Sequence, residues 1–327
     1  MNIGELYKIV VEEGIKQDPR SREKILRYLQ SVREEYNRLS PPEKTAFDKE
    51  KFTNPYSDTR LLYGSPKTSV HTIMVGVDIE TPELLLADRL KKSGKNIDLV
   101  IAHHPEGYAR ADFYRVMNVL HDIFKEAGLR GLKFKKMLDE RINEVMRKTI
   151  SGNCTQAVDA ARLLDMPFMC AHTVCDNFAY QYFYNIIKKQ KPQKVSDILD
   201  LLYGIPEYKI AMKNNLGPRV ILGKPSNKCG KVMIEMTGGT EGPKNIYKEL
   251  VRKKVKTFIC MHVSEEHFKK AKKHDINIII AGHISSDTLG INLLLDKVEK
   301  HKKLNIISCS GFTRIRRKGS APSVYNI

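Results

Sequence analysis

Hydrophobic and polar positions alternate along the chain with the periods of helices and strands. Within residues 1–50, apolar side chains recur at three- and four-residue spacing, which predicts a helical cover interrupted by two consecutive prolines. An apolar strand at residues 70–79 is followed by a helix at residues 83–93 and a second strand at residues 98–102. This strand–helix–strand unit predicts parallel, right-handed pairing, with ligands at the carboxyl ends of the strands.

The rest of the chain continues this alternation. The expected helices are two within residues 111–146, then residues 154–164, 244–254 and 265–274, and the expected strands are residues 166–173, 231–236, 258–261, 276–281 and 304–308. We therefore predict a two-lobed α/β fold with mostly parallel or mixed sheets covered by helices. A metal-binding lobe with the helical cover is expected to comprise residues 1–205 and 276–327, and a second, smaller α/β lobe residues 206–275.

The composition is that of an ordinary globular protein. Its 327 residues are 41% hydrophobic, which suffices for a packed core. No stretch approaches the roughly 18 consecutive apolar residues of a membrane span, and the first residues lack the apolar core of a signal peptide, so we expect a cytoplasmic protein without a membrane partner. The six cysteines form no CxxC pair and are expected to be reduced, with Cys170 and Cys175 as packing residues.

The charge favours anionic partners. A formal net charge of +18 predicts salt-dependent attraction to polyanions. The basic residues fall in short runs, mostly at expected helix ends, where the helix dipole favours them without any ligand. No nucleic-acid-binding motif accompanies them. Binding to nucleic acid therefore rests on charge only.

Two adjacent histidines, His103 and His104, end the apolar strand at residues 98–102. Pro105 biases His104 toward an extended conformation, so the pair is expected where the strand becomes a loop. Taken alone, such a pair is explained by one buried and one solvated ring. The alternative is a metal site.

Histidines also end two other apolar strands, in FMCAHT and IIIAGH, and each has an aspartate four positions later. If the three strands lie in one parallel sheet, their carboxyl ends bring together His103, His104, His172, Asp176, His283 and Asp287. Burying these groups without a partner is costly, whereas divalent metal satisfies them. Imidazole and carboxylate suit zinc, iron or manganese, and so many ligands fit two ions. A helix is expected to start at Ser285 or Ser286.

The motifs YSDTRLLYG, VDIETPE, DLVIAHHP, AHTVCD and AGHISSD, in this order, resemble the dinuclear-metal family of the NGG-interacting factor three, a type 2 GTP cyclohydrolase I-like family. The resemblance implies metal ligands at His103, His104, Asp176, His283 and Asp287, and leaves open whether His172 is one. It also implies a two-lobed α/β protein, often a ring-shaped homohexamer with the metals facing an inner cavity.

Two departures from the family pattern affect the expected site. Asp287 stands where the family usually has glutamate, and its shorter side chain is expected to coordinate through one oxygen or through water. The spacing from His104 to His172 is also longer than usual, so the extra helices within residues 111–146 are expected to reshape the mouth of the cavity.

Three functional hypotheses follow. The first is a metal-dependent hydrolase acting on a purine nucleotide such as GTP, which rests on the resemblance. The second is a metal-binding regulatory or adaptor protein without turnover, and the third is a ring that binds nucleic acid. Glu106 is a candidate general acid or base, or else a solvated loop residue. The segment TGGTEG is a plain turn before a helix, or an anion site.

Overall fold

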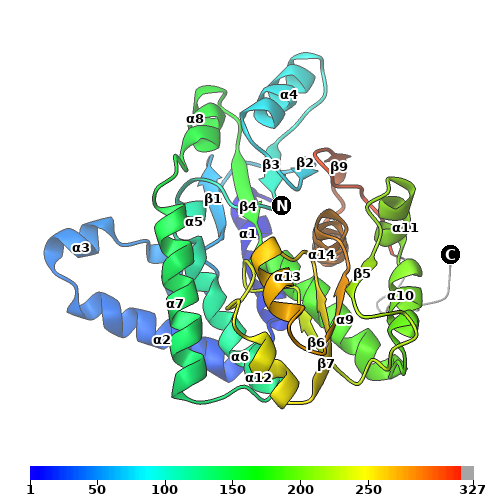
Figure 1. Cartoon of the computed structure of the whole chain (residues 1–327). Helices are drawn as coiled ribbons and strands as arrows, with labels where there is room; N and C mark the ends of the chain where they lie inside the picture. Colours follow the sequence, from blue (N-terminus) through cyan, green and yellow to red (C-terminus); the bar gives the residue numbers. More distant parts are fainter. Residues whose placement is uncertain (318–327) are drawn as a thin grey trace.

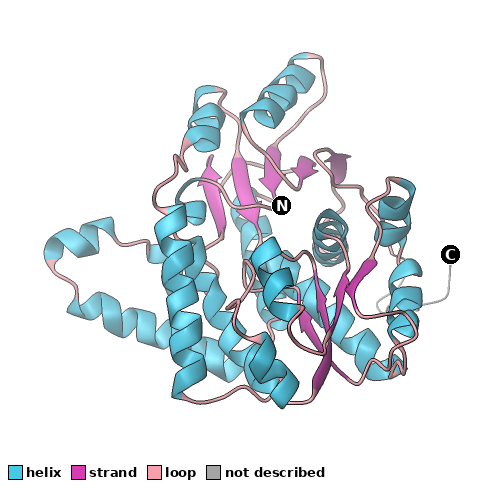
Figure 2. Cartoon of the chain, in the orientation of Figure 1, coloured by secondary structure: helices cyan, strands magenta, loops and turns pink. Residues whose placement is uncertain are grey.

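A computed structural model describes residues 1–317, which form two β-sheets with helices around and between them (Figure 2). The five-stranded sheet has the order β1 (Thr59–Tyr63), β4 (Phe168–Ala171), β3 (Leu99–Ala102), β2 (Thr72–Gly76), β9 (Asn305–Ser308). β1 is antiparallel to β4, and all other pairs in this sheet are parallel. The predicted parallel unit of β2 and β3, connected by a helix, is confirmed.

The four-stranded sheet has the order β5 (Arg219–Leu222), β8 (Asn277–Ile280), β7 (Val255–Cys260), β6 (Lys231–Glu235). β5 is antiparallel to β8, and the other pairs are parallel. The prediction that residues 276–327 all belong with the first lobe is wrong at β8. The reason is that Ile278 and Ile279 of this strand are fully buried in the hydrophobic core of the second sheet, beside Phe258 and Ile259 of β7.

The helices are α1 (Ile3–Lys16), α2 (Arg22–Arg38), α3 (Pro41–Ala46), α4 (Thr81–Lys92), α5 (Gly107–Ala111), α6 (Leu120–Glu126), α7 (Leu132–Thr149), α8 (Gln156–Leu163), α9 (Thr173–Gln190), α10 (Val195–Tyr203), α11 (Pro206–Lys213), α12 (Tyr247–Arg252), α13 (Glu265–Ala271) and α14 (His283–Val298), with 3₁₀ helices η1 (Lys49–Phe52) and η2 (Phe113–Val119). The structure is thus the predicted mixed α/β fold of sheets covered by helices. Residues 111–146, where two helices were expected, are divided among α5, η2, α6 and α7.

The N-terminal helices only partly form the predicted cover. Ile3 and Leu6 of α1 are fully buried in the core of the first sheet. In contrast, α2 and α3 project from the side of the molecule (Figure 1). Pro41 and Pro42 form the first turn of α3, where a missing backbone N–H costs nothing. They end α2 and begin a new helix.

Helices α9 and α14 connect the two cores. Each places some residues in the hydrophobic core of the first sheet and others in that of the second, for example Phe178 and Phe183 of α9. The two helices approach closely at Gly290 of α14, where an added Cβ would lie 2.4 Å from the carbonyl oxygen of Cys175. Only glycine allows this separation without a shift of one helix. The first turn of α9 therefore packs against the middle of α14.

The cysteines agree with a further expectation. All six cysteines are free, and Cys170 and Cys175 are buried in the hydrophobic cores, which confirms their interpretation as packing residues. Within residues 1–317, the helices lack the combination of length and apolar character that crossing a membrane demands.

Candidate metal centre

Three of the predicted histidines meet at the carboxyl ends of two neighbouring strands. His103 and His104 follow β3 directly, and their backbone N–H groups continue the pairing with β2 by donating to the carbonyls of Gly76 and Val77. Ala102 of β3 pairs with Cys170 of β4, so His104 and His172, each two residues later, are opposite one another. The ring centroids of His103 and His172 are 4.7 Å apart. The strand-end position predicted for the histidine pair is confirmed.

The fourth histidine comes from the other sheet. His283 follows β8, and its ring centroid lies 5.1 Å from that of His104. The expectation of three strands in one parallel sheet is therefore wrong, because β8 pairs with β7 in the four-stranded sheet. The helix expected at Ser285 or Ser286 begins at His283 itself. The histidines converge because the carboxyl ends of strands from both sheets face one another.

The two aspartates are held by the first turns of α9 and α14. His172 is the N-cap residue of α9 and His283 the first residue of α14, so Asp176 and Asp287 follow them four residues later. Residues four apart on a helix share one face. Asp287 lies between the histidines: its Oδ1 is 3.5 Å from Nε2 of His103, and its Oδ2 is 3.5 Å from Nε2 of both His104 and His283. Each sequence-predicted ligand is thus within one cluster.

Several inward-facing atoms of this cluster have no hydrogen-bond partner within residues 1–317. They are Nε2 of His103, Oδ1 of Asp176 and both carboxylate oxygens of Asp287, all buried. Buried polar atoms are normally satisfied, because an unpaired one costs about 1–3 kcal/mol. Three groups of side chains offer ligand atoms within 4.8 Å of one another: His103–Asp176–Asp287, His104–His283–Asp287 and His103–His104–His172. These residues fit divalent metal ions.

The outward-facing nitrogens of the three histidines from the first sheet are held by acceptors. Nδ1 of His172 lies 2.8 Å from Oδ2 of Asp58, Nδ1 of His104 lies 2.6 Å from Oδ1 of Asp78, and Nδ1 of His103 lies 3.2 Å from the carbonyl oxygen of Ala171. A proton on Nδ1 leaves the Nε2 lone pair free for a metal, and metal-bound histidines commonly have such a second partner.

Asp58 and Asp78 were not identified as site residues from the sequence, although both lie in the quoted motifs. The strand register explains their positions. Thr59 of β1 pairs with Ala171 of the antiparallel β4, which places Asp58 opposite His172. Gly76 pairs with Ala102, so Asp78 and His104, each two residues later, are opposite one another. In the sequence, each of the two is an acidic residue next to the end of a strand. Only the strand order shows which histidine it faces.

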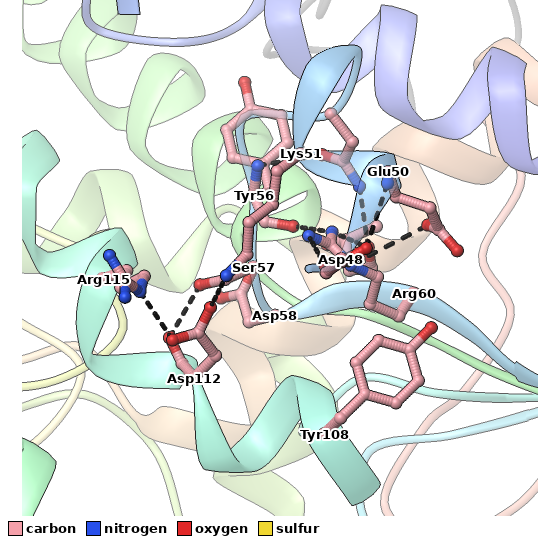
Figure 3. Close-up of polar contacts among 12 residues, drawn as sticks. Asp48, Glu50, Lys51, Tyr56, Ser57, Asp58, Arg60, Tyr108, Asp112 and Arg115 are labelled. Atoms are coloured by element: carbon pink, nitrogen blue, oxygen red, sulfur yellow. Dashed lines mark hydrogen bonds and ion pairs between the residues drawn. The ribbon is translucent and has the colours of Figure 1, made fainter. Parts of the chain in front are cut away.

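The segment that carries Asp58 is held by ion pairs and hydrogen bonds (Figure 3). The fully buried Arg60 forms an ion pair with Asp48, with 3.0 Å between Nη2 and Oδ2. On the other side, the hydroxyl of Ser57 donates a 2.8 Å hydrogen bond to the carbonyl of Asp112. These contacts fix the backbone on both sides of Asp58 and thereby the position of the His172 ring.

Electrostatics couple the histidines to Asp287. Burial disfavours a charged ring at His103, but Asp287 and Asp176 outweigh burial and raise the pKa of His103 well above its usual value. Burial also disfavours a charged ring at His104, but hydrogen bonds to Asp287 and Asp78 outweigh it and raise the pKa of His104 to about 9. Burial opposes ionisation of Asp287 as well, yet the neighbouring histidines lower its pKa. For His283, burial prevails and lowers the pKa. Asp287 is therefore an anion surrounded by imidazoles.

A cleft with an empty volume of ≈ 400 Å³ opens onto the cluster. It is lined by His172 and Asp176, which follow β4, by His283 and Asp287 of α14, and by residues at the strand ends of the second sheet: Glu235, Cys260, His262 and residues in the range 236–241. The TGGTEG segment, residues 237–242, forms a bend ahead of α12 and lines this cleft. The described cleft residues include no lysine or arginine.

Two other expectations about the site have clear outcomes. Glu106 is only 8% exposed and accepts a 3.2 Å hydrogen bond from Arg110, so its interpretation as a solvated loop residue is wrong. Burial raises its pKa to about 6.

The segment of residues 111–146 does reach the site. The ring of Phe113 lies 5.5 Å from that of His172, and an added Cβ at Gly239 of the opposite wall would lie 2.9 Å from Phe113.

Taken together, the fold and the cluster define an α/β protein with a histidine- and aspartate-lined cleft between two sheets. The NIF3 superfamily protein from Sphaerobacter thermophilus has a similar structure, with a TM-score of 0.73 at 23% sequence identity, over 93% of this chain and 97% of that one. The chain therefore has the fold of a NIF3 superfamily protein, as the resemblance to the NGG-interacting factor three implied.

More distant similarities extend to other solved structures. Reduced HcgD from Methanocaldococcus jannaschii is 14% identical, with a TM-score of 0.45 over 83% of this chain and 97% of that one. A Bacillus cereus protein related to NIF3 is 11% identical, with a TM-score of 0.37 over 77% of this chain and 90% of that one. No protein-family model and no curated protein sequence matches the chain.

Proposed function

We propose that this protein is a hydrolase that depends on two divalent metal ions. The observation that carries the proposal is the Asp287 carboxylate, which is buried, has no hydrogen-bond partner within residues 1–317 and faces a different histidine set with each oxygen. One ion would be held by His103, Asp176 and Asp287, and the other by His104, His283 and Asp287. Zinc, iron and manganese suit these ligands.

The chemistry of such a pair is hydrolytic. Held by these residues, two divalent ions would supply an activated water and polarise an electrophilic carbon or phosphorus centre. The residues of this chain hold and orient the ligand atoms: Asp58 and Asp78 fix the rings of His172 and His104, and the packing of α9 against α14 fixes the distance between the two aspartates. Phe113 lies against His172 and limits access of water to that side.

The proposed substrate is a purine nucleotide such as GTP, as the family resemblance implies. The cleft supports binding of the base rather than of the phosphates. Glu235 and Glu241 supply carboxyl groups that can accept hydrogen bonds from ring and amino N–H groups, and the described lining has no lysine or arginine to bind a triphosphate. The phosphates would then extend out of the cleft, where the net charge of +18 favours them.

Four further expectations belong to this proposal, and they concern the oligomeric state, the location, the division into lobes and the cofactors. The chain is proposed to form a homohexamer, to act in the cytoplasm, and to be divided into a metal-binding lobe and a smaller lobe around the second sheet. Two ions per subunit are proposed as its cofactors. Light scattering at several protein concentrations tests the hexamer.

A polyanion-binding role is a second candidate, favoured by a cleft with an empty volume of ≈ 890 Å³ bordered by α7, α12 and α13. Its lining includes Lys133, Lys244, Lys248, Lys270 and Lys273. Glu249 and Glu266 pair with the first two, and Lys248, Lys270 and Lys273 form no ion pair within residues 1–317. An RNA or DNA phosphate backbone would suit such a surface. A non-catalytic regulatory or adaptor role is the remaining alternative.

Metal analysis and turnover assays test the proposal together. We expect about two transition-metal ions per subunit in protein purified without chelator, and loss of most metal in the double variant His103→Ala, His104→Ala. Ring-opened product from GTP would support the hydrolase. A metal-loaded protein without product favours the regulatory alternative, and a stable wild type without metal refutes the centre. Single-stranded DNA binding that does not weaken as salt rises would exclude the polyanion role.

A further inference from the structure

We propose that His262, in the loop after β7, is an additional ligand of the ion at His104, His283 and Asp287. This inference rests on the proposed dinuclear centre and concerns a residue that the sequence motifs do not include. The ligand class is a divalent transition metal that accepts imidazole nitrogen. The second sheet would then contribute two histidines to the centre, from two adjacent strands.

The strand register brings His262 to the centre. β7 and β8 are parallel, and Cys260 pairs with Ile280. His262 therefore lies opposite Gly282, next to His283. The ring centroids of His262 and His283 are 4.9 Å apart, with an interplanar angle of 49°. The same relationship of parallel strand ends places His104 beside His172 in the first sheet. Both sheets thus present histidines from adjacent strand ends to the same cleft.

The surroundings of His262 favour a role at the metal. His262 lines the cleft together with His172, Asp176, His283 and Asp287. Its ring forms no hydrogen bond within residues 1–317, in contrast to the buried His267 of the same segment, which accepts from or donates to the hydroxyl of Tyr247 at 3.0 Å. The His267 ring therefore has a hydrogen-bond partner in the protein, whereas the ring nitrogens of His262 are available to bind a metal ion.

The number of ligands leaves room for His262. His104, His283 and Asp287 offer three ligand atoms, and a divalent ion that also binds a water can expand to five ligands. His262 is exposed and belongs to a loop, and its ring would turn about its side-chain torsions to reach the ion. An imidazole there would supply the fourth protein ligand of this ion, while the ion at His103, Asp176 and Asp287 would be unaffected.

Cobalt substitution provides a readout that does not depend on activity. The metal-free full-length protein would be titrated with Co²⁺ while the visible d–d absorption, which reports ligand number and type, is recorded. In the wild type we expect two binding events. His262→Ala should weaken one event at least ~10-fold and change its absorption while the other event is preserved, since removing a direct ligand costs at least as much as removing an outer partner. His262→Asp, which retains a ligand atom, should bind more tightly than His262→Ala.

The matched control is His301→Ala, which removes an exposed histidine from the turn after α14. It should titrate like the wild type. A His262→Ala spectrum and affinity equal to those of the wild type would overturn the role of His262, and equal weakening of both ions would overturn it in favour of a structural effect. A wild type that binds only one Co²⁺ ion or none refutes the dinuclear centre and this inference with it.

Discussion

The Asp58 carboxylate lies 2.8 Å from Nδ1 of His172 and accepts a 2.5 Å hydrogen bond from the hydroxyl of Thr173. It therefore fixes both the His172 ring and the first residue of α9, the helix that carries Asp176. A residue outside the cluster of ligand atoms thus orients two elements of the centre at once.

Replacing Asp58 with asparagine should weaken metal binding about 10-fold, because the start of α9, which positions Asp176, and the His172 ring both lose their charged partner while the shape of the side chain is retained. Competition with a chromophoric chelator measures the change. Asp275→Asn is the control, because Asp275 is 87% exposed in an ion pair with Lys256 and should have no effect. Unchanged affinity in a folded Asp58→Asn protein would contradict the proposed role.

The close contact of α9 and α14 predicts the effect of Gly290→Ala. The new methyl group would lie 2.4 Å from the Cys175 carbonyl oxygen, so the helices must separate. Overpacking of this kind costs about 1–3 kcal/mol, and the separation should also weaken metal binding, because Asp176 and Asp287 lie on these helices. Chemical denaturation and chelator competition measure the two effects. Gly152→Ala, where the nearest atom is 3.7 Å away, should be nearly neutral.

The buried carboxyl group of Glu235 should make the free energy of unfolding of the wild type depend on pH. Burial raises its pKa from 4.5 to about 8, so the fold disfavours the ionised carboxylate. This destabilisation is absent below pH ~4.5, grows as pH rises to about 8 and is constant above. Glu235→Gln removes the titration and should gain stability over the wild type between pH 5 and pH 9, by about 2 kcal/mol or more. Urea denaturation at both pH values tests this, and a difference independent of pH would contradict it.

Arg317 neutralises a fully buried glutamate. Its Nη2 donates hydrogen bonds of 2.6 and 2.8 Å to the two oxygens of Glu207, whose side chain has no exposed area. Arg317→Ala should cost about 3 kcal/mol, because Glu207 would remain buried without its cation. The double variant Arg317→Met, Glu207→Leu should recover much of this loss. Thermal unfolding measures both variants, and Arg162→Ala, at a 57% exposed position, is the control.

The sequence predicted the α/β class and that these histidines and aspartates lie together, but not the way the cluster is assembled. His103, His104 and His172 could be placed because each follows a short apolar run, and a strand end is a local property. The assignment of β8 to a sheet depends on which strands it pairs with, and that is decided by the burial of Ile278 and Ile279 against distant residues. Strand order is not encoded in any local pattern.

The site residues that the sequence did not predict were missed for the same physical reason. Asp58, Asp78 and His262 are ordinary polar residues beyond strand ends in the sequence, and only the register between strands places them opposite His172, His104 and Gly282. Glu106 was misjudged for a related reason. Its burial comes from packing of the loop after β3, whereas its neighbours in the sequence suggest a solvated turn.

The proposed ligands come from both sheets: His103, His104 and Asp176 follow strands of the first, and His283 and Asp287 follow β8 of the second. Ions bound among them would cross-link the two sheets. Part of the folding free energy would then be metal-binding free energy, growing as RT ln(1 + [L]/Kd) with the concentration of free ion. Depletion of metal would thereby lower the free energy of unfolding of the chain as well as remove the proposed activity.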